Sequence, residues 1–379
     1  MMNNKLGLYI HIPFCQKKCS YCDFYSCPAS DTRKAEYTAA LTSQMKTFAP
    51  KMSGRCFDTV FIGGGTPTCL DSSMLATIIE TARNCFCISG SAELTLETNP
   101  GLYDKTDFKL LASLGVNRLS VGLQSADAHE LELLGRIHSV ADYEHTLEAA
   151  RGAGITNINT DIMFSLPDQR ADTLMRTLDF VLTHNPTHIS AYALKLESGT
   201  PLFEARAGLQ LPDEDADADM YLAMVERLEC AGFVHYEISN FALPGHECRH
   251  NLKYWHAEEY LGLGPAAHSY VDSVRYACAR DLDGFIRAYT NTPETAEKTL
   301  MTENNTIGTL EAAREKVMLG LRLGAGVSKS ALQAAGSLDI DRKIQMLIAN
   351  RLAYDTPDGI ALTARGMYVS NAVISLMLE

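Results

Sequence analysis

The first two-thirds of the chain alternates short apolar runs with longer stretches in which apolar residues recur every three or four positions. Short apolar runs are typical of buried strands, and the longer period is typical of amphipathic helices. We predict strands over residues 6–11, 58–62, 93–97, 118–122, 159–164 and 188–192. We predict helices over residues 34–48, 72–84, 106–114, 140–153 and 171–183. This alternation indicates an α/β fold with a parallel sheet, either barrel-like or doubly wound.

The alternation stops at about residue 241. From about residue 309 the pattern predicts a helix, a short helix, another helix and two short strands joined by a turn at Asp358-Gly359. Helices followed by such a hairpin resemble a winged helix. We therefore predict two domains, an α/β domain over residues 1–240 and a C-terminal domain over residues 241–379. A run of acidic residues over 213–219 suits the dipole of a helix N-terminus and needs no further role.

The formal net charge of the chain is −13, with 46 acidic against 33 basic side chains. This balance argues against a nucleic-acid partner, because phosphate contacts require clustered Lys and Arg. The tail over residues 310–379 has eight Lys and Arg against seven Asp and Glu, which disfavours a DNA-linked redox regulator. The sequence has no apolar run of about 18 residues and no apolar leader, so we expect no membrane insertion. Eleven cysteines without a secretory signal favour the reducing cytoplasm.

Cys15, Cys19 and Cys22 follow the first predicted strand at C-x3-C-x2-C spacing. Thiolates are the ligands that iron–sulfur clusters require, and a loop this short can direct three of them at one centre. Three thiolates bind three irons of a [4Fe–4S] cubane and leave the fourth iron open to another ligand. A zinc site completed by His11 or Cys27 is the alternative, although zinc commonly uses paired C-x2-C ligands.

Tyr21 stands directly before the third cysteine, and this motif after a strand resembles the signature of the radical S-adenosylmethionine (SAM) superfamily. The flanking residues 11–15 and 21–24 resemble the family that contains oxygen-independent coproporphyrinogen III oxidase and haem chaperones. The resemblance implies a partial (β/α)6 TIM-like barrel with a [4Fe–4S] cluster on the three cysteines. It also implies SAM at the fourth iron, an electron donor that reduces the cluster, and cleavage of SAM to a 5′-deoxyadenosyl radical.

Further candidate residues follow successive predicted strands. The glycine run 63–65 allows positive φ and close approach of the backbone to a ligand. Carboxylates at the carboxyl ends of barrel strands point toward the mouth where such active sites lie. The resemblance assigns the binding of SAM, as one molecule or two, to Tyr9, Tyr21, Gly64, Gly65, Thr66, Glu97, Gln124, Arg136 and Asp161.

Two features distinguish the branches of this family. Phe24 occupies the position at which the oxidase has a further cysteine, which argues against oxidative decarboxylation of coproporphyrinogen III to protoporphyrinogen IX. That activity is the alternative function. Residues 250–255 read H-N-x-x-Y-W, a motif typical of the haem-chaperone branch, and residues 262–269 are also similar to that branch. The resemblance then implies haem as cargo and haem-receiving proteins, such as respiratory enzymes, as partners.

His250, Trp255 and His268 are the candidate haem contacts, because imidazole ligates haem iron and aromatic rings stack on a porphyrin. The alternative is a hydrogen-bonded interface histidine beside a core tryptophan. The other cysteines lack ligand spacing, apart from a Cys85-x-Cys87 pair, and we expect them to behave as small apolar residues.

Overall fold

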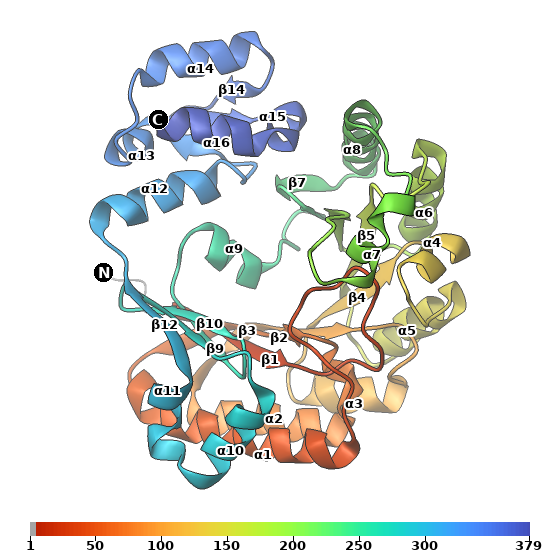
Figure 1. The fold of residues 1–379 in the computed structure, drawn as a ribbon, viewed down its shortest axis with the longest axis vertical. Helices are drawn as coiled ribbons and strands as arrows, with labels where there is room; N and C mark the ends of the chain where they lie inside the picture. The colour runs from red at the N-terminus through yellow and green to blue at the C-terminus, as the bar shows by residue number, and fades with distance from the viewer. Residues whose placement is uncertain (1–4) are drawn as a thin grey trace. The chain divides into compact units, whose positions relative to one another are not determined.

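The computed structural model describes residues 5–379 and divides into two compact units, each built from separated segments of the chain (Figure 1). The first unit contains residues 5–162, Leu194–Leu209 and Glu259–Thr306. The second unit contains Met163–Ala193, Gln210–Glu258 and Ile307–Glu379. The expected domain boundary at residue 240 stays a prediction.

The first unit is centred on a sheet whose leading strands are parallel and lie side by side in sequence order. They are β1 (Lys5–Ile12), β2 (Cys56–Gly64), β3 (Cys87–Thr98), β4 (Arg118–Gln124) and β5 (Asn157–Phe164). On the other side of β1 the sheet continues through β9, which is parallel to it, and then through antiparallel strands. These are β9 (Tyr260–Leu263), β10 (His268–Val271), β11 (Val274–Cys278) and β12 (Met301–Thr306). The predicted α/β fold with a large parallel sheet is confirmed.

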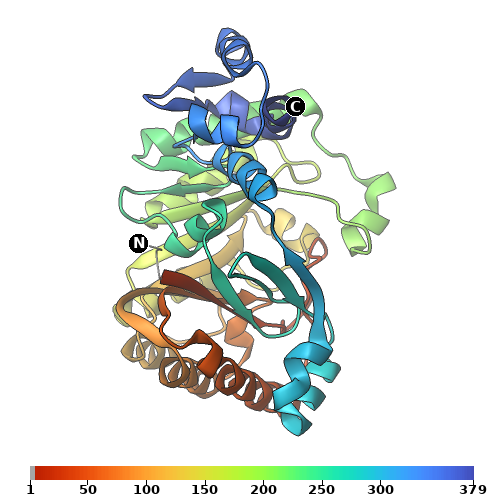
Figure 2. The ribbon, with the colours of Figure 1, turned by 90° about the vertical axis from the view of Figure 1, so that its left-hand side faces the viewer.

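Helices connect the parallel strands and lie along one face of β1 to β3, as Figures 1 and 2 show. The longer ones are α1 (Asp31–Phe48), α2 (Ser72–Cys85), α3 (Lys105–Ser113), α5 (Val140–Gly152) and α10 (Leu282–Asn291), the last packed on α1. The short ones are α4 (Ala128–Leu133), α7 (Pro201–Glu204), α11 (Pro293–Leu300) and the 3-10 helices η1 (Ala49–Met52), η2 (Pro67–Cys69) and η3 (Arg206–Gly208). Leu6, Leu8, Ile10 and Ile12 alternate along β1 and are fully buried, so they form part of this core.

In the second unit, strands β6, β8 and β7 pair antiparallel in that order, with helices around them. Its elements are β6 (His188–Ala193), β7 (Val234–Glu237), β8 (Asn240–Ala242), α6 (Ala171–Thr183), α8 (Glu214–Cys230) and α9 (Arg249–Trp255). The acidic run begins α8 as expected, because the Asp213 side chain accepts a hydrogen bond from Ala216 N at 2.8 Å.

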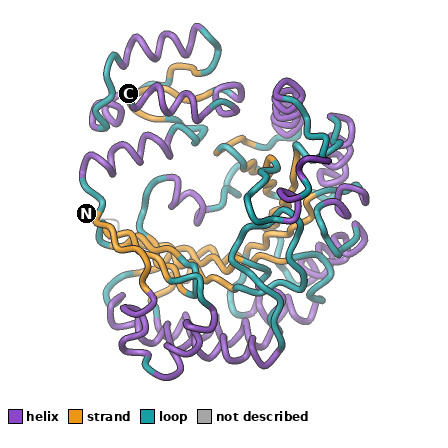
Figure 3. Tube along the Cα trace, in the orientation of Figure 1, coloured by secondary structure: helices purple, strands orange, loops and turns teal. Residues whose placement is uncertain are grey.

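The tail of the second unit has the predicted order of helices and hairpin, with helices around a three-stranded antiparallel sheet (Figure 3). Its elements are α12 (Thr309–Gly320), β13 (Val327–Ser328), α13 (Lys329–Ala334), α14 (Ile340–Ala349), β14 (Ala353–Asp355), β15 (Gly359–Leu362), α15 (Ala364–Tyr368) and α16 (Ser370–Leu378). Leu332, Leu347 and Ile360 are among the buried residues of its core. None of the helices within residues 5–379 is long and apolar enough to cross a membrane.

Candidate cofactor site

The three motif cysteines lie on a loop that leaves the carboxyl end of β1 and returns beside it. Cys15 N donates to Cys27 O at 3.2 Å and Cys27 N donates to Pro13 O at 3.0 Å, so backbone pairing closes the loop. The loop is also held in the middle, where Ser20 N donates to Leu134 O at 3.0 Å. Cys15, Cys19 and Cys22 are therefore presented from one closed loop, and Cys27 contributes to its closure.

The surroundings of Cys22 disfavour its thiolate when no metal is bound. Burial raises the pKa of Cys22, and the neighbouring Cys19 and Cys15 raise it further. The positive charge of bound iron would offset both effects. Within residues 5–379, no three His, Cys, Asp or Glu side chains are placed to hold one metal ion. A [4Fe–4S] cubane does not need such convergence, because each thiolate binds a different iron.

His11 on β1 is hydrogen-bonded to the cysteine loop, and Tyr9 is hydrogen-bonded to His11. His11 Nε2 lies 2.9 Å from the carbonyl oxygen of Tyr25, and His11 Nδ1 lies 2.9 Å from the Tyr9 hydroxyl. Because a carbonyl can only accept, Nε2 has the proton and Nδ1 accepts from Tyr9. Burial lowers the pKa of His11 to about 4, so the imidazole is neutral at physiological pH. The Tyr9 hydroxyl is thus engaged with His11, and its predicted contact with SAM stays a prediction.

The glycine run 63–65, which begins in the last two residues of β2, is hydrogen-bonded to the same loop. Gly65 N donates to Ile12 O at 2.8 Å and Thr66 N donates to Phe14 O at 2.7 Å. A Cβ atom at Gly65 would lie only 2.6 Å from the Phe14 carbonyl oxygen, so a larger residue does not fit. Gly64 has a φ of +114°, and its amide donates to the Glu97 carboxylate at 3.0 Å. The sequence motif therefore forms a tight backbone cradle against the cysteine loop.

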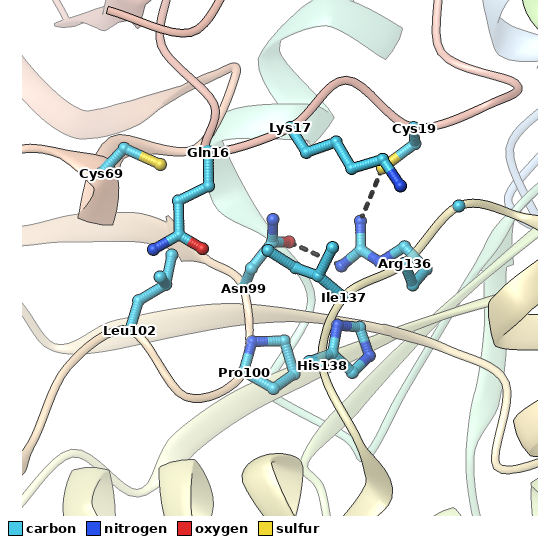
Figure 4. Close-up of a pocket in the computed structure, with 11 residues that line it drawn as sticks. Gln16, Lys17, Cys19, Cys69, Asn99, Pro100, Leu102, Arg136, Ile137 and His138 are labelled. Atoms are coloured by element: carbon cyan, nitrogen blue, oxygen red, sulfur yellow. Dashed lines mark hydrogen bonds between the residues drawn. The ribbon is translucent and has the colours of Figure 1, made fainter. Parts of the chain in front are cut away.

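A chain of hydrogen bonds connects two of the cysteines across the cradle. Thr66 Oγ1 lies 3.5 Å from Cys15 Sγ and accepts from Asn99 Nδ2 at 3.0 Å. Arg136 Nη2 donates to Asn99 Oδ1 at 2.7 Å, while Arg136 Nη1 donates to Cys19 Sγ at 3.4 Å (Figure 4). Asn99 is the centre of this chain, and the sequence analysis gave it no role. The sequence feature that could have indicated Asn99 is its position directly after the strand that contains Glu97.

Figure 4 shows the cavity at this point, with Asn99, Arg136 and Cys19 on its wall. Cys69, which follows the glycine cradle, also lines the cavity. Burial, together with the nearby Cys15, raises the pKa of Cys69 to about 11, so its thiol stays protonated. Of the predicted cofactor residues, Arg136 and the cluster ligand Cys19 line this cavity, and the binding of SAM stays a prediction.

Two carboxylates of the first unit, Glu97 on β3 and Asp161 on β5, lie on the two strands that flank β4. Burial, and the Asp161 carboxylate, raise the pKa of Glu97 to about 8, although part of the side chain stays accessible. Asp161 accepts from Asn159 Nδ2 at 2.7 Å and from Ser120 Oγ at 3.3 Å. A positively charged ligand would stabilise the ionised form of Glu97. The pair therefore suits a cationic cofactor such as SAM.

Gln124 and Tyr21 complete the predicted set. Gln124 follows a bulge at the end of β4, has a φ of +74°, and is nearly buried. Its amide lies beside Gly122, where Asn99 and Arg136 also converge. Burial raises the pKa of Tyr21, and Arg136 opposes this rise from close by. All nine predicted SAM residues and the three cysteines thus belong to the first unit.

The candidate haem residues are distributed over both units. His250 is fully buried on α9, and its Nε2 forms a 2.8 Å hydrogen bond with the Tyr254 hydroxyl. Trp255 ends α9 and is partly exposed. His268 is exposed on β10, and its Nδ1 lies 3.8 Å from a Glu303 carboxylate oxygen. His268 therefore presents an accessible imidazole, whereas His250 stabilises the helix.

Comparison with known proteins places this geometry in a family. Residues 9–181 match the model of the radical SAM superfamily, and residues 309–369 match the HemN C-terminal domain. The heme chaperone HemW of Bacillus subtilis is 34% identical over 98% of both chains. The heme chaperone HemW of Mycobacterium tuberculosis is 32% identical over 100% of this chain and 96% of the relative. The chain belongs to the HemW family.

The fold of this HemW-family chain is also similar to a solved structure. Coproporphyrinogen III oxidase (HemN) from Escherichia coli, a radical SAM enzyme, superposes with a TM-score of 0.84. The likeness covers 98% of this chain and 90% of the oxidase at 22% identity, so it shows the shared fold. The radical SAM domain confirms the superfamily, whose domain uses a [4Fe–4S] cluster and SAM. The matched C-terminal domain corresponds to the predicted winged-helix-like tail.

Proposed function

We propose that this chain is a cytoplasmic haem chaperone with a [4Fe–4S] cluster and SAM, and that it transfers haem to haem-dependent proteins such as respiratory enzymes. The observation that carries the proposal is the end-to-end relation to proteins named heme chaperone HemW. Phe24 supports it, because an exposed phenylalanine stands two positions after Cys22, where the oxidase has a further cysteine.

In this proposal Cys15, Cys19 and Cys22 hold the cluster. Thr66 and Arg136 donate to the Cys15 and Cys19 sulfurs, which stabilises the thiolates and orients them. The chemistry that the bound groups supply is one-electron reductive cleavage of SAM, after reduction by an electron donor.

The side chains that we propose to bind SAM include both acidic and basic residues. Glu97 and Asp161 supply negative charge for the cationic cofactor, and Arg136 supplies positive charge for its carboxylate. Gly64 and Gly65 bring the backbone close, and Tyr9 acts through His11 on the loop. Thr66, Gln124 and Tyr21 complete the site from neighbouring loops and strands.

Haem contact is assigned to Trp255 and His268, which are accessible, and to His250. For His250 to ligate iron through Nε2, it must give up its bond to Tyr254. The three variants H268A, H250A and W255A therefore test separate contributions.

The proposal is tested by anaerobic titration of reconstituted protein with haem, followed by absorbance. We expect about one haem per chain, weaker binding in at least one of the three variants, and unchanged binding in H256A. His256 is a suitable control because it is exposed and directly follows Trp255. Wild-type protein that binds no haem would refute the chaperone function. Turnover of coproporphyrinogen III with SAM and reductant in the same preparation would replace it with the oxidase activity.

A further inference from the structure

Two cysteines without an assigned role lie together in the first unit. Cys56 is the first residue of β2 and Cys87 is the first residue of β3, and the two are partners in the parallel ladder. Their Sγ atoms are 3.4 Å apart, and the Cys87 thiol donates to Cys56. Adjacent strands lie about 4.8 Å apart, which is within the Cα separation of about 4.4–6.8 Å that disulfides span. The backbone therefore allows a bond between these sulfurs without a large rearrangement.

The pair is accessible and remote from the cofactor site. Cys87 is exposed and Cys56 is partly buried, so reagents in solution reach Cys87 first. Strands β1 to β3 are parallel, and the cysteine loop follows the carboxyl end of β1. The pair lies at the amino ends of β2 and β3, about 25 Å from the cradle at a rise of about 3.3 Å per residue. Oxidation at this edge can therefore proceed without contact with the cluster ligands.

We propose that Cys56 and Cys87 form a reversible thiol–disulfide pair that is oxidised by low-molecular-weight disulfides such as glutathione disulfide. The Cys87 thiolate attacks one sulfur of the oxidant and releases one thiolate, which leaves a mixed disulfide on Cys87. Cys56 then loses its proton and attacks the Cys87 sulfur, which releases the second thiolate. Two electrons pass from the two protein thiols to the oxidant, which leaves as two thiols after taking up the two protons.

The structure distinguishes this pair from the one that the sequence suggests. Cys85 and Cys87 are separated by one residue, but Cys85 is the last residue of α2. Cys87 has already entered β3, where its ladder partner is Cys56. The spatial neighbour, rather than the sequence neighbour, is therefore expected to form the bond.

The test uses cluster-loaded protein, kept anaerobic in buffers with defined ratios of reduced and oxidised glutathione. Free thiols are blocked with N-ethylmaleimide, and tryptic peptides are analysed by mass spectrometry. Cleavage after Arg55, Arg83 and Lys105 gives one peptide over residues 56–83 and another over residues 84–105. We expect these two peptides to be joined in the oxidised sample and separate after treatment with dithiothreitol.

Matched serine variants identify the sulfurs, because each peptide has a second cysteine, Cys69 or Cys85. The cross-link should be lost in C56S and in C87S, and kept in C69S and in C85S. Absence of the cross-link in wild type, glutathione on Cys87 without a cross-link, or a cross-link that persists in C87S would each overturn the proposal. Thermal unfolding of C87S checks that the variant is folded. Because the readout needs neither SAM nor haem, it is independent of the proposed function.

Discussion

Glu97 offers a direct test of the proposed SAM site, because the pKa of its carboxyl group is raised well above the usual value. Its pKa is about 8, raised by burial and by the Asp161 carboxylate. Below this pH the free protein therefore has Glu97 mostly protonated. SAM has a permanent positive charge at its sulfonium, which favours the ionised carboxylate. Binding of SAM should then release a proton, and the affinity should rise with pH until Glu97 is ionised without help.

The magnitude follows from the ionised fraction of Glu97. With a pKa of about 8, about 1% of the side chains are ionised at pH 6 and about half at pH 8. If only the ionised form of Glu97 binds SAM, the affinity for SAM increases by about 50-fold from pH 6 to pH 8. Above about pH 8 the affinity levels off. In the variant E97Q the group cannot titrate, so only the ligand's own ionisation remains. Wild-type affinity should therefore rise more steeply with pH than that of E97Q.

The assay is anaerobic equilibrium dialysis of SAM against cluster-loaded protein between pH 6 and pH 8.5. The matched control is E237Q, because burial also raises the pKa of Glu237 to about 8 and this residue belongs to the second unit. E237Q should show the same pH dependence of SAM binding as wild type. Equal slopes for wild type and E97Q would refute the assignment of Glu97 to the cofactor site.

Two further predictions concern the cluster and the tail. The variant N99A removes the central residue of the hydrogen bonds that lead to Cys15 and Cys19. We therefore expect a chelator to extract iron about tenfold faster, measured by the loss of cluster absorbance. An unchanged rate would show that these hydrogen bonds do not support the cluster. In the tail core, L332A should lower the free energy of unfolding by about 2–5 kcal/mol in urea titrations. The control L338A, at a side chain that is 66% exposed, should change it by less than about 0.5 kcal/mol, and equal effects would contradict the described core.

Much of the fold could be predicted from the sequence because buried parallel strands leave a strong signal. The run Leu6–Ile12 is almost wholly apolar, and β1 covers it. Other parts had weaker signals. The strands β9 to β12 are short and partly exposed, and β12 has an almost wholly polar sequence, Met301–Thr306. The pairing of β9 with β1, and of β10 to β12 beyond it, depends on long-range contacts that local periodicity does not report.

The candidate site was predicted unevenly for a similar reason. The cysteines and glycines belong to compact motifs, so their spacing is informative. Asn99 has no motif of its own, and its importance follows from two contacts far away in sequence, with Thr66 and Arg136. The state of His250 was also hidden, because only the structure shows its bond to Tyr254. The sequence thus identifies residue types suited to a chemistry, while hydrogen-bond partners decide which atoms are available for it.

The parallel sheet explains why such distant residues meet. The parallel strands β1 to β3 deliver their loops to the same edge, so the cysteine loop after β1, the cradle at the end of β2 and Asn99 after β3 become neighbours. The amino ends of the same strands meet at the opposite edge, where Cys56 and Cys87 come together. One topological rule therefore produces two separate groups of sulfur atoms. The group at the carboxyl edge has surrounding donors, glycines and carboxylates suited to a cofactor, whereas the exposed pair at the amino edge is suited to exchange with small disulfides.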